Sequence, residues 1–357
     1  MEERTVDIVL IGVGNLGRRF LQLVSERDSR LEKLYGLRLR VVGVADSRGA
    51  AWSPDGLNLE TVVGLKEGGG SVADYRDVGY TGVEPLEVVS SLEADVLCEA
   101  SPVNLADGGE PGLSCIRAAL ERGMHVVTPN KGPMVLAYRE LVETASAQGV
   151  KLRFDGTVAG GLPALYLGMR DLRGSVIERI ETVPNVVTGY ILDLLGGGMS
   201  WDDALAKAKQ IGHLEADPAW DVDGWDATAK LAILANAVLG LPVSLDDVDR
   251  KGIRGIRPEE IHRERESGRS IRLLGRAERG ADGDYSLSVQ PEALPSKHPL
   301  GRLGSHELGI VYYTDIYGTI SAVIDEPTPL PSAATMLRDI LDIYVADRYC
   351  RPGINYT

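Results

Sequence analysis

Two lysines stand where their ammonium groups could transfer a proton. Asp226 and Lys230 are four residues apart in a segment with helical periodicity, so their side chains share one helix face. The apolar run LAILANAVLG follows, which indicates a buried helix whose charged end faces a cleft. Lys131 lies in the turn TPNK just beyond a strand, at the edge where open α/β sheets bind ligands. These positions favour a catalytic site, and a solvated salt bridge between Asp226 and Lys230 is the alternative.

A GxGxxG loop near the N-terminus could bind a dinucleotide. A strand precedes the loop, a helix follows it, and an acidic residue closes the next strand. Glycines in this setting allow a tight turn and let the backbone approach a pyrophosphate at the helix N-terminus. An ordinary glycine-rich turn is the alternative. The loop residues expected at the cofactor are Gly12, Gly14, Asn15, Leu16 and Gly17.

The end of the second strand leaves the choice between NAD and NADP open. Asp46 could accept hydrogen bonds from the adenosine ribose, which favours NAD, whereas Ser47 and Arg48 could hold a 2′-phosphate, which favours NADP. The long interval between Gly17 and Asp46 predicts either an extended first helix or an extra loop near residues 31–37.

The order of the predicted strands and helices, which must position these residues, changes near residue 155. Before it, strand-like runs at 6–11, 39–45, 96–100, 125–128 and 151–154 alternate with helical stretches that include 16–25, 112–122 and 135–148. This alternation predicts a Rossmann-type, doubly wound parallel sheet in an α/β domain. After it, strands are predicted at 175–183, 270–277, 284–291, 308–314 and 319–324, with helices at 200–210, 226–239, after Pro258 and at 332–347. The second half is therefore predicted to be an α+β domain on a mixed or antiparallel sheet.

The length of the chain predicts two domains, and its net charge limits the kinds of partner that it can bind. A chain of 357 residues exceeds what one core usually organises. We expect a dinucleotide-binding domain at 1–155, with the C-terminal helix in 329–357 packing back on it, and a catalytic and dimerisation domain at 156–328. The net charge of −14 argues against nucleic acid and anionic membranes as partners.

Cysteine usage and apolar runs indicate a cytoplasmic protein. Cys98, Cys115 and Cys350 have no CxxC spacing and no accompanying histidine cluster, which argues against a disulfide framework and a structural zinc. The N-terminal apolar run is too short for a signal peptide, and the longest one, at 231–243, is too short to span a membrane.

Four segments together resemble the homoserine dehydrogenase family in its short form, without a C-terminal regulatory domain. They are GVGNLG at 12–17, VVTPNKGP at 126–133, DGTVAGGLP at 155–163 and LEADPAWDVDGWDATAKLAILA at 214–235. The resemblance implies hydride transfer between NAD or NADP and a small amino-acid substrate, interconverting L-homoserine and L-aspartate 4-semialdehyde. It also implies a homodimer formed through the sheet of the second domain.

The resemblance assigns roles to residues. Lys131 and Lys230 would handle the proton, while Glu215 and Asp226 would hold the substrate's amino end and orient the lysines. Asp221, Asn185 and His213 join the substrate site, and Ser101 and Thr128 join the cofactor site. A lysine beside carboxylates stays protonated near neutral pH and can donate a proton to a carbonyl oxygen, so oxidation should need alkaline pH.

The segment DGTVAGGLP resembles the family's interdomain hinge, which can hold a monovalent cation through backbone carbonyls. Val158 and Gly160 would be such donors, with Asp155 in place of the family's usual glutamate. A glycine-rich interdomain turn without an ion is the equal alternative.

Three departures bear on the substrate. Val187 stands where the family has a threonine that contacts substrate, and His213 occupies a position that is often aromatic or apolar. The residues at 324–331 form an acidic, proline-rich turn where the family has a glycine loop. Two further hypotheses therefore stay open: a related dehydrogenase of another small hydroxy, oxo or amino acid, and a non-catalytic NAD(P)-binding regulatory protein.

Overall fold

The computed structural model describes residues 4–210 and 218–345, and these residues form two compact units. The first unit contains the chain up to Gly161 together with the chain from Thr328 onward, and the second unit is Leu162–Pro327. The second unit is therefore inserted into the first. These boundaries differ by a few residues from the predicted ones, because the turn after residue 155 belongs to the first unit.

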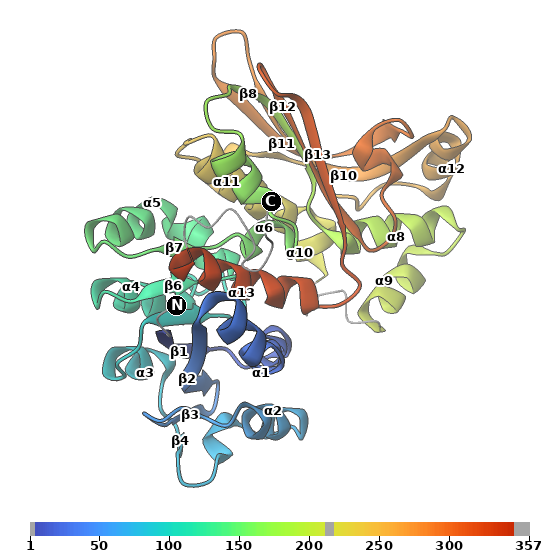
Figure 1. The fold of residues 1–357 in the computed structure, drawn as a ribbon. Coiled ribbons are helices and arrows are strands. Elements are labelled where there is room, and N and C mark those ends of the chain that lie inside the picture. Colours follow the sequence, from blue (N-terminus) through green and yellow to red (C-terminus); the bar gives the residue numbers. More distant parts are fainter. Residues whose placement is uncertain (1–3, 211–217, 346–357) are drawn as a thin grey trace. The chain divides into compact units, whose positions relative to one another are not determined.

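A seven-stranded sheet organises the first unit (Figure 1). Its order is β4 (Gly79–Thr81), β3 (Gly49–Trp52), β2 (Leu37–Asp46), β1 (Arg4–Ile11), β5 (Val96–Glu99), β6 (His125–Val127) and β7 (Leu152–Arg153). The strands from β2 to β7 pair in parallel, which confirms the predicted parallel sheet. The edge strands β3 and β4 pair antiparallel and were not predicted, because their segments are too short to show a periodic pattern.

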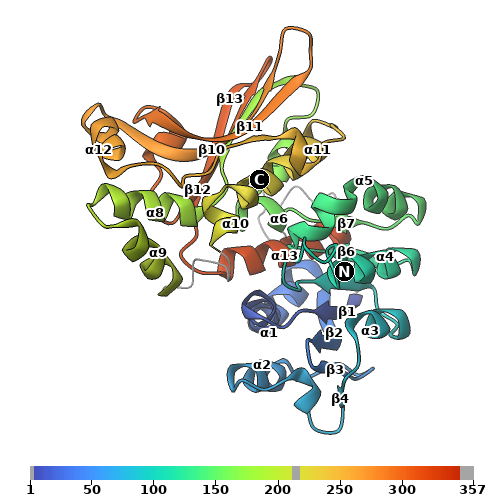
Figure 2. The same cartoon turned by 180° about the vertical axis from the view of Figure 1, so that it is seen from behind.

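Helices cover both faces of this sheet, as a doubly wound fold requires (Figure 2). They are α1 (Asn15–Tyr35), α2 (Leu59–Glu67), α3 (Pro85–Ser91), α4 (Gly112–Glu121), α5 (Lys131–Ala147), α6 (Gly156–Ala159) and α13 (Leu330–Tyr344), with a 3₁₀ turn, η1, at Val72–Asp74. Helix α4 contacts both α3 and α5, and α1 contacts α2 and α13. The 21 residues of α1 account for the long interval before Asp46, so the extended helix is the correct alternative.

The last helix completes the core of the first unit. Met336 and Ile340 of α13 are buried in one cluster with Phe20 and Leu21 of α1 and with residues of β1. The predicted final helix exists and begins at Leu330, where Pro331 suits the first turn because that turn needs no N–H from it.

A six-stranded sheet organises the second unit. Its order is β13 (Gly318–Asp325), β12 (Glu307–Thr314), β8 (Ile177–Val183), β10 (Arg269–Arg279), β11 (Tyr285–Pro295) and β9 (Asp249–Arg250). All neighbours are antiparallel except β9 and β11, which confirms the predicted mixed sheet. The helices are α7 (Ala164–Tyr166), α8 (Val186–Gly196), α9 (Trp201–Gln210), α10 (Ala219–Val222), α11 (Trp225–Val238) and α12 (Pro258–Glu266), with a π turn, η2, at Leu167–Asp171 and 3₁₀ turns at Leu245–Asp247 (η3) and Pro299–Arg302 (η4).

Helix α11 packs directly on this sheet. It contacts β10 and β11, and its residues from Asp226 to Asn236 are buried except Lys230. Gly275 of β10 admits the helix, since a Cβ there would meet Thr182 Cγ2 at 3.1 Å and Leu231 Cβ at 3.8 Å. The buried helix expected from the apolar run is confirmed.

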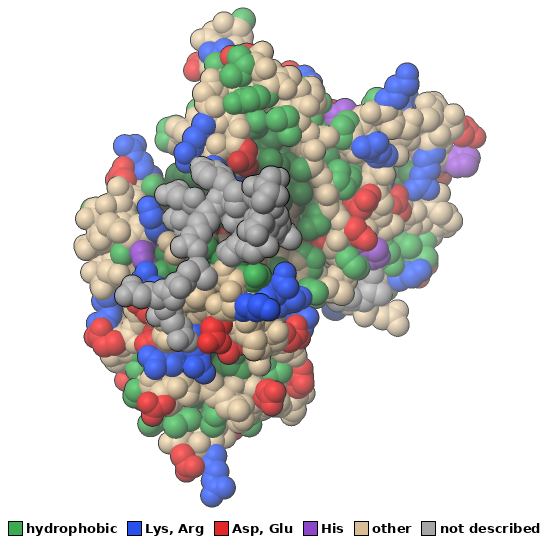
Figure 3. Space-filling model, viewed as in Figure 1, with side chains coloured by type: hydrophobic (Ala, Val, Ile, Leu, Met, Phe, Trp, Pro, Cys, Tyr) green, Lys and Arg blue, Asp and Glu red, His purple; other side chains and the backbone are tan. Residues whose placement is uncertain are grey.

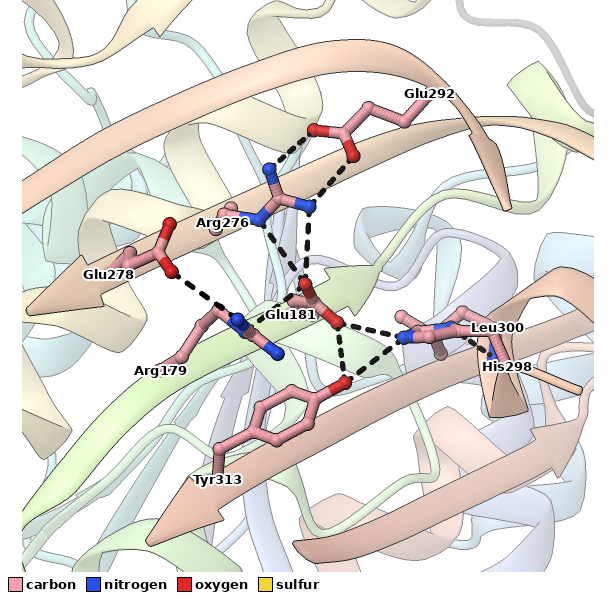
Figure 4. Close-up of polar contacts among 8 residues, drawn as sticks. All are labelled: Arg179, Glu181, Arg276, Glu278, Glu292, His298, Leu300 and Tyr313. Atoms are coloured by element: carbon pink, nitrogen blue, oxygen red, sulfur yellow. Dashed lines mark hydrogen bonds and ion pairs between the residues drawn. The ribbon is translucent and has the colours of Figure 1, made fainter. Parts of the chain in front are cut away.

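A network of charges, the Glu181 cluster, links four strands of the second sheet with the chain beside η4 (Figure 4). Glu181 is 3% exposed and accepts hydrogen bonds from Tyr313 (2.8 Å) and Arg276 (3.2 Å). It also lies 2.9 Å from His298 Nε2 and 3.3 Å from Arg179. Burial alone would raise the pKa of Glu181, but the Tyr313 hydrogen bond and the two guanidinium charges hold it below its ordinary value.

On the face drawn in Figure 3, acidic and basic side chains are interspersed over the described surface. Among the described residues, no helix combines the length and the apolar character needed to cross a bilayer.

We expect Glu181→Gln to lower the free energy of unfolding by about 1–3 kcal/mol at neutral pH, because the partly buried guanidinium groups of Arg179 and Arg276 lose an ionised partner. The folded pKa is depressed, so this stabilisation is present above the unfolded pKa of about 4.3 and is lost as pH falls through the folded value. Urea unfolding at one protein concentration, from about pH 7 to about pH 3, should show a difference that shrinks in acid. Glu178→Gln, at an exposed position of the same strand, is the control. A difference independent of pH would contradict the assignment.

Candidate functional site

The glycine loop between β1 and α1 has two kinds of glycine. A Cβ on Gly12 would lie 2.3 Å from the Ala100 carbonyl oxygen, and one on Gly17 would lie 2.1 Å from the Gly12 carbonyl oxygen. Packing therefore requires both. A Cβ on Gly14 would meet no atom within 4 Å, so packing does not explain this glycine. The open space beside it, at the N-terminus of a 21-residue helix, fits the close approach of a pyrophosphate.

The Asp46 carboxylate is already fully hydrogen-bonded within the protein. Its partners are Arg48 N (2.9 Å) and Ser71 Oγ (2.8 Å) on Oδ1, and Lys66 Nζ (2.6 Å) and Val72 N (3.0 Å) on Oδ2. A carboxylate offers about four lone-pair sites, and all four are used here. Burial alone would raise the pKa of Asp46, but these bonds, with Lys66 first, hold it below its ordinary value.

This arrangement changes how the end of β2 can meet a ribose. Asp46 is 9% exposed and would have to release a partner before it could accept a ribose hydroxyl. Ser47 and Arg48 are exposed, and the Arg48 guanidinium donates to the Gly69 carbonyl at 3.1 Å. Two cationic side chains, Lys66 and Arg48, therefore stand at this strand end, and Lys66 was not singled out from the sequence.

The carboxyl ends of β5 and β6 form a second buried network, the Glu99 network. Glu99 is fully buried and accepts hydrogen bonds from the Ser101 backbone N–H (2.8 Å), the Ser101 hydroxyl and the Thr128 hydroxyl (3.1 Å). Burial raises the pKa of Glu99, although these donors act in the opposite direction. Ser101 and Thr128, both predicted at the cofactor, are thus joined by a carboxylate that sequence reasoning missed.

The same network holds the start of α5, where Lys131 is the first helical residue. Thr128 Oγ1 accepts from Asn130 N at 3.0 Å, and the Asn130 side chain caps the helix by accepting from Gly132 N at 3.0 Å. Gly112 of α4 makes room for this arrangement. A Cβ there would lie 2.9 Å from Asn130 Nδ2 and 3.0 Å from the carboxyl carbon of Glu99.

In the second unit, the predicted catalytic lysine is part of a hydrogen-bonded group with one asparagine and two aspartates. Lys230 Nζ lies 2.9 Å from Asp226 Oδ2 and donates to the Pro184 carbonyl at 2.7 Å. Asn185 Nδ2 donates to Asp226 Oδ2 at 2.7 Å and to Asp221 Oδ1 at 2.8 Å. The carboxylates are each 4% exposed and the lysine side chain is 17% exposed. The solvated salt bridge is therefore the wrong alternative for this pair.

Asn185 also fixes the backbone beside these groups. Its Oδ1 accepts from Val187 N (2.7 Å) and Thr188 N (3.2 Å) and so caps α8. Val187, which stands where the family has a threonine, lies in the first turn of that helix and is 8% exposed. The cap and the bridge to the aspartates use every hydrogen-bonding position of the amide.

The predicted residues divide between the two units. Lys131 and the predicted cofactor residues belong to the first unit, whereas Asn185, Asp221, Asp226 and Lys230 belong to the second. His213 and Glu215 lie outside the described residues. The turn that replaces the family's glycine loop runs from the end of β13 to the start of α13. The described residues hold no cluster of histidine, cysteine and acidic side chains suited to a metal ion.

Comparisons with known proteins cover both units. The family model for homoserine dehydrogenase matches residues 163–341, and the model for the homoserine dehydrogenase NAD-binding domain matches residues 12–155. A homoserine dehydrogenase of Methanocaldococcus jannaschii is 33% identical over 95% of this chain and 98% of its own length. An NAD(+)-dependent homoserine dehydrogenase of Pseudomonas canavaninivorans is also 33% identical, over 94% and 96% respectively.

Solved structures agree with these matches. A hyperthermophilic archaeal homoserine dehydrogenase in complex with NADPH superposes with a TM-score of 0.83 at 27% identity, over 96% of this chain and 98% of that one. The homoserine dehydrogenase of Thermoplasma acidophilum superposes with a TM-score of 0.81 at 25% identity, over 95% and 98%. Sequence, domain order and fold agree over nearly the whole chain, and the chain belongs to the homoserine dehydrogenase family.

Proposed function

We propose that this chain interconverts L-homoserine and L-aspartate 4-semialdehyde, using NAD or NADP. The observation that carries the proposal is the buried group of Asn185, Asp221, Asp226 and Lys230. Family membership over both units supports it, as does the NAD(+)-dependent relative. A bound nicotinamide would supply the hydride chemistry at C4 of the amino acid, and the residues of this chain would supply binding and proton transfer.

Lys230 is suited to act on the substrate oxygen. An ammonium has three N–H donors. Among the described residues, Asp226 and the Pro184 carbonyl engage two of them, which leaves one for the oxygen at the reacting carbon. In reduction this N–H delivers a proton to the carbonyl oxygen, and in oxidation the neutral amine takes the proton from the alcohol. Lys131 shares this role in the proposal.

The carboxylates are suited to the other end of the substrate. Asp221 and Asp226 converge on one asparagine amide, so negative charge is concentrated where an amino-acid ammonium could bind. We assign Glu215 and His213 to the same site on the strength of the sequence resemblance.

The Glu99 network would position Lys131. It ties the ends of β5 and β6 to the cap of α5 through Ser101, Thr128 and Asn130. A lysine at the first position of a helix whose cap is buried has its backbone fixed, so its side chain starts from a defined point.

At the adenosine end, we infer that the strand terminus is prepared for a 2′-phosphate. The filled lone pairs of Asp46 disfavour ribose hydroxyls as new partners, and Lys66 with Arg48 provides positive charge there. NAD would bind if Asp46 exchanged one internal partner for a ribose hydroxyl.

A related dehydrogenase acting on another small hydroxy acid is the second candidate. Val187 favours it, because an apolar side chain stands beside the Asn185 group at the position where a hydroxyl was expected. In that case the same proton chemistry would act on a different alcohol.

We also propose a homodimer formed through the second unit's sheet, and a cytoplasmic location. Within the described part of the chain, strand β13 pairs only with β12, so its other edge is open there, and Val323 of that strand is 39% exposed. Open edges of this kind are usually covered in native proteins. Cys98 and Cys115 are buried free thiols, as suits a reducing compartment.

We expect Lys230→Ala to lower kcat by at least about 10²-fold while cofactor binding persists, because proton transfer is lost. Nicotinamide absorbance with homoserine and either cofactor at alkaline pH measures turnover, and cofactor fluorescence measures binding. Lys251→Ala, at an exposed lysine of the same unit, is the control. Turnover of another alcohol but not homoserine by the unaltered protein would favour the second candidate. Cofactor binding without any turnover would favour a regulatory protein.

Gly112→Ala should disturb the Glu99 network. In a helix, alanine is ordinarily favoured over glycine by about 1 kcal/mol. Here the new Cβ would press on Asn130 and Glu99, so we expect a loss of about 1–3 kcal/mol in unfolding free energy and a lower kcat. Gly64→Ala is the control, since a Cβ at Gly64 in α2 meets nothing within 4 Å. If the two variants had the same unfolding free energy and the same kcat, the Glu99 network would have no role in positioning Lys131.

Lys66→Met should raise KM for NADP more than KM for NAD, by about ten- to hundredfold, because one charged contact is worth about 1.5–3 kcal/mol. Initial rates with each cofactor at saturating homoserine provide the ratio. Lys33→Met, at an exposed site on α1, should leave both constants unchanged. An equal rise in both constants would show that Lys66 only supports the fold.

A further inference from the structure

The turn after β7 is held by an arginine from the last helix. This turn, residues 155–161, carries the carbonyls that the family resemblance links with a monovalent cation. Arg338 of α13 forms an ion pair with Asp155 and donates to the Gly161 carbonyl at 3.4 Å. The Thr335 hydroxyl donates to the Gly160 carbonyl at 2.9 Å, and Arg338 Nη2 lies 3.4 Å from that hydroxyl. All these residues belong to the first unit.

Asp155 is the residue of this turn that most needs a positively charged partner. Its carboxylate is fully buried, whereas Arg338 is 34% exposed. A buried carboxylate needs a positive partner or a set of donors to remain ionised. The guanidinium provides this charge and reaches the neighbouring backbone carbonyl with the same planar group.

The turn fits an alkali-metal ion poorly. Such an ion would need several oxygens that no other donor uses, in a place free of positive charge. The Gly160 carbonyl already accepts a hydroxyl proton, and a guanidinium stands at the adjoining carbonyl and at the carboxylate. Bringing a second positive charge to the same oxygens would be opposed by electrostatic repulsion.

We propose that the Arg338 guanidinium replaces the monovalent cation in this chain. Thr335 completes the arrangement by binding Gly160, the residue expected to donate to an ion. The turn is thus fixed by a covalently attached charge that does not dissociate. The stability and activity of the protein should therefore not depend on which monovalent cation is in solution. Loss of Arg338 should leave a site that a monovalent cation can occupy.

This turn also borders the TPNK segment. A Cβ on Gly156 would lie 3.2 Å from Pro129 Cβ and 3.5 Å from Thr335 Cγ2, so the turn is packed between that segment and α13. Fixing the turn therefore supports the segment that leads to Lys131. Arg338 would act as a positioning residue, at a distance from the chemistry.

The test compares sodium, potassium and choline chloride at equal ionic strength, using the full chain. The melting temperature and kcat/KM of the unaltered protein should be the same in the three salts. Arg338→Met should melt at a lower temperature in choline chloride and recover part of the loss, with part of kcat/KM, in sodium or potassium chloride. Arg338→Lys, which keeps the charge, should show a weaker response to the ions.

Arg153→Met is the matched control. Arg153 also pairs with an aspartate, Asp342 of α13, at 2.6 Å, but the pair does not involve the carbonyls of the turn. Its loss should lower the melting temperature equally in all three salts. A saturable rise in the melting temperature or in kcat/KM of the unaltered protein with sodium or potassium would overturn the proposal. So would an Arg338→Met protein that no ion restores, or one that fails to fold in every salt.

The melting temperature requires no turnover, so this test stays valid if the substrate proposal fails. A protein inactive on homoserine could still show the ion response in Arg338→Met alone. Conversely, an active homoserine dehydrogenase that needs sodium or potassium would refute the arginine proposal and leave the reaction intact.

Discussion

The ion pair between Lys230 and Asp226 imposes the main constraint on the second unit. An ammonium that is largely removed from water must be met by charge and by hydrogen-bond acceptors, and among the described residues it meets one carboxylate and one backbone carbonyl. The carboxylate then needs its own donor, which Asn185 provides. Asn185 can do so only because it begins a helix directly after β8. The helix, the strand end and the pair on α11 therefore specify one another.

In the first unit, buried carboxylates must likewise be met by hydrogen-bond donors or by positive charge. Glu99, Asp46 and Asp155 are each buried at or just beyond the end of a strand, and each is held by a different kind of donor. Hydroxyl and backbone groups hold Glu99, a lysine joins such groups around Asp46, and an arginine holds Asp155. The chain at these strand ends is thus fixed by buried carboxylates and the groups that donate to them.

Local patterns in the sequence were sufficient to predict much of the fold and part of the candidate site. The strand-glycine-helix order placed the dinucleotide loop, and the long interval before Asp46 required an extended α1. The spacing of Asp226 and Lys230 placed both on one helix face, and the following apolar run indicated their burial. The edge strands β3 and β4 and the cap function of Asn185 were missed, because short segments and polar turns carry little periodic signal.

Other features depend on contacts between residues far apart in the chain, which one sequence does not reveal. Arg338 and Asp155 are separated in the sequence by the whole inserted unit, and Lys66 contacts Asp46 of β2 from helix α2. The prediction that Asp46 could accept hydrogen bonds from a ribose did not take the contact with Lys66 into account. Without the fold, a single lysine on a helix surface gives no sign of which carboxylate it will contact.

The insertion of one unit into the other has a consequence for synthesis of the protein on the ribosome. Met336 and Ile340 of α13 belong to the same core as Phe20 and Leu21, yet they are translated only after the whole segment Leu162–Pro327. At about 5–20 residues per second, the nascent first unit waits on the order of ten seconds for its last helix. During that time the face of α1 that α13 covers stays exposed. The inserted unit, whose segment is continuous, can complete its own core first.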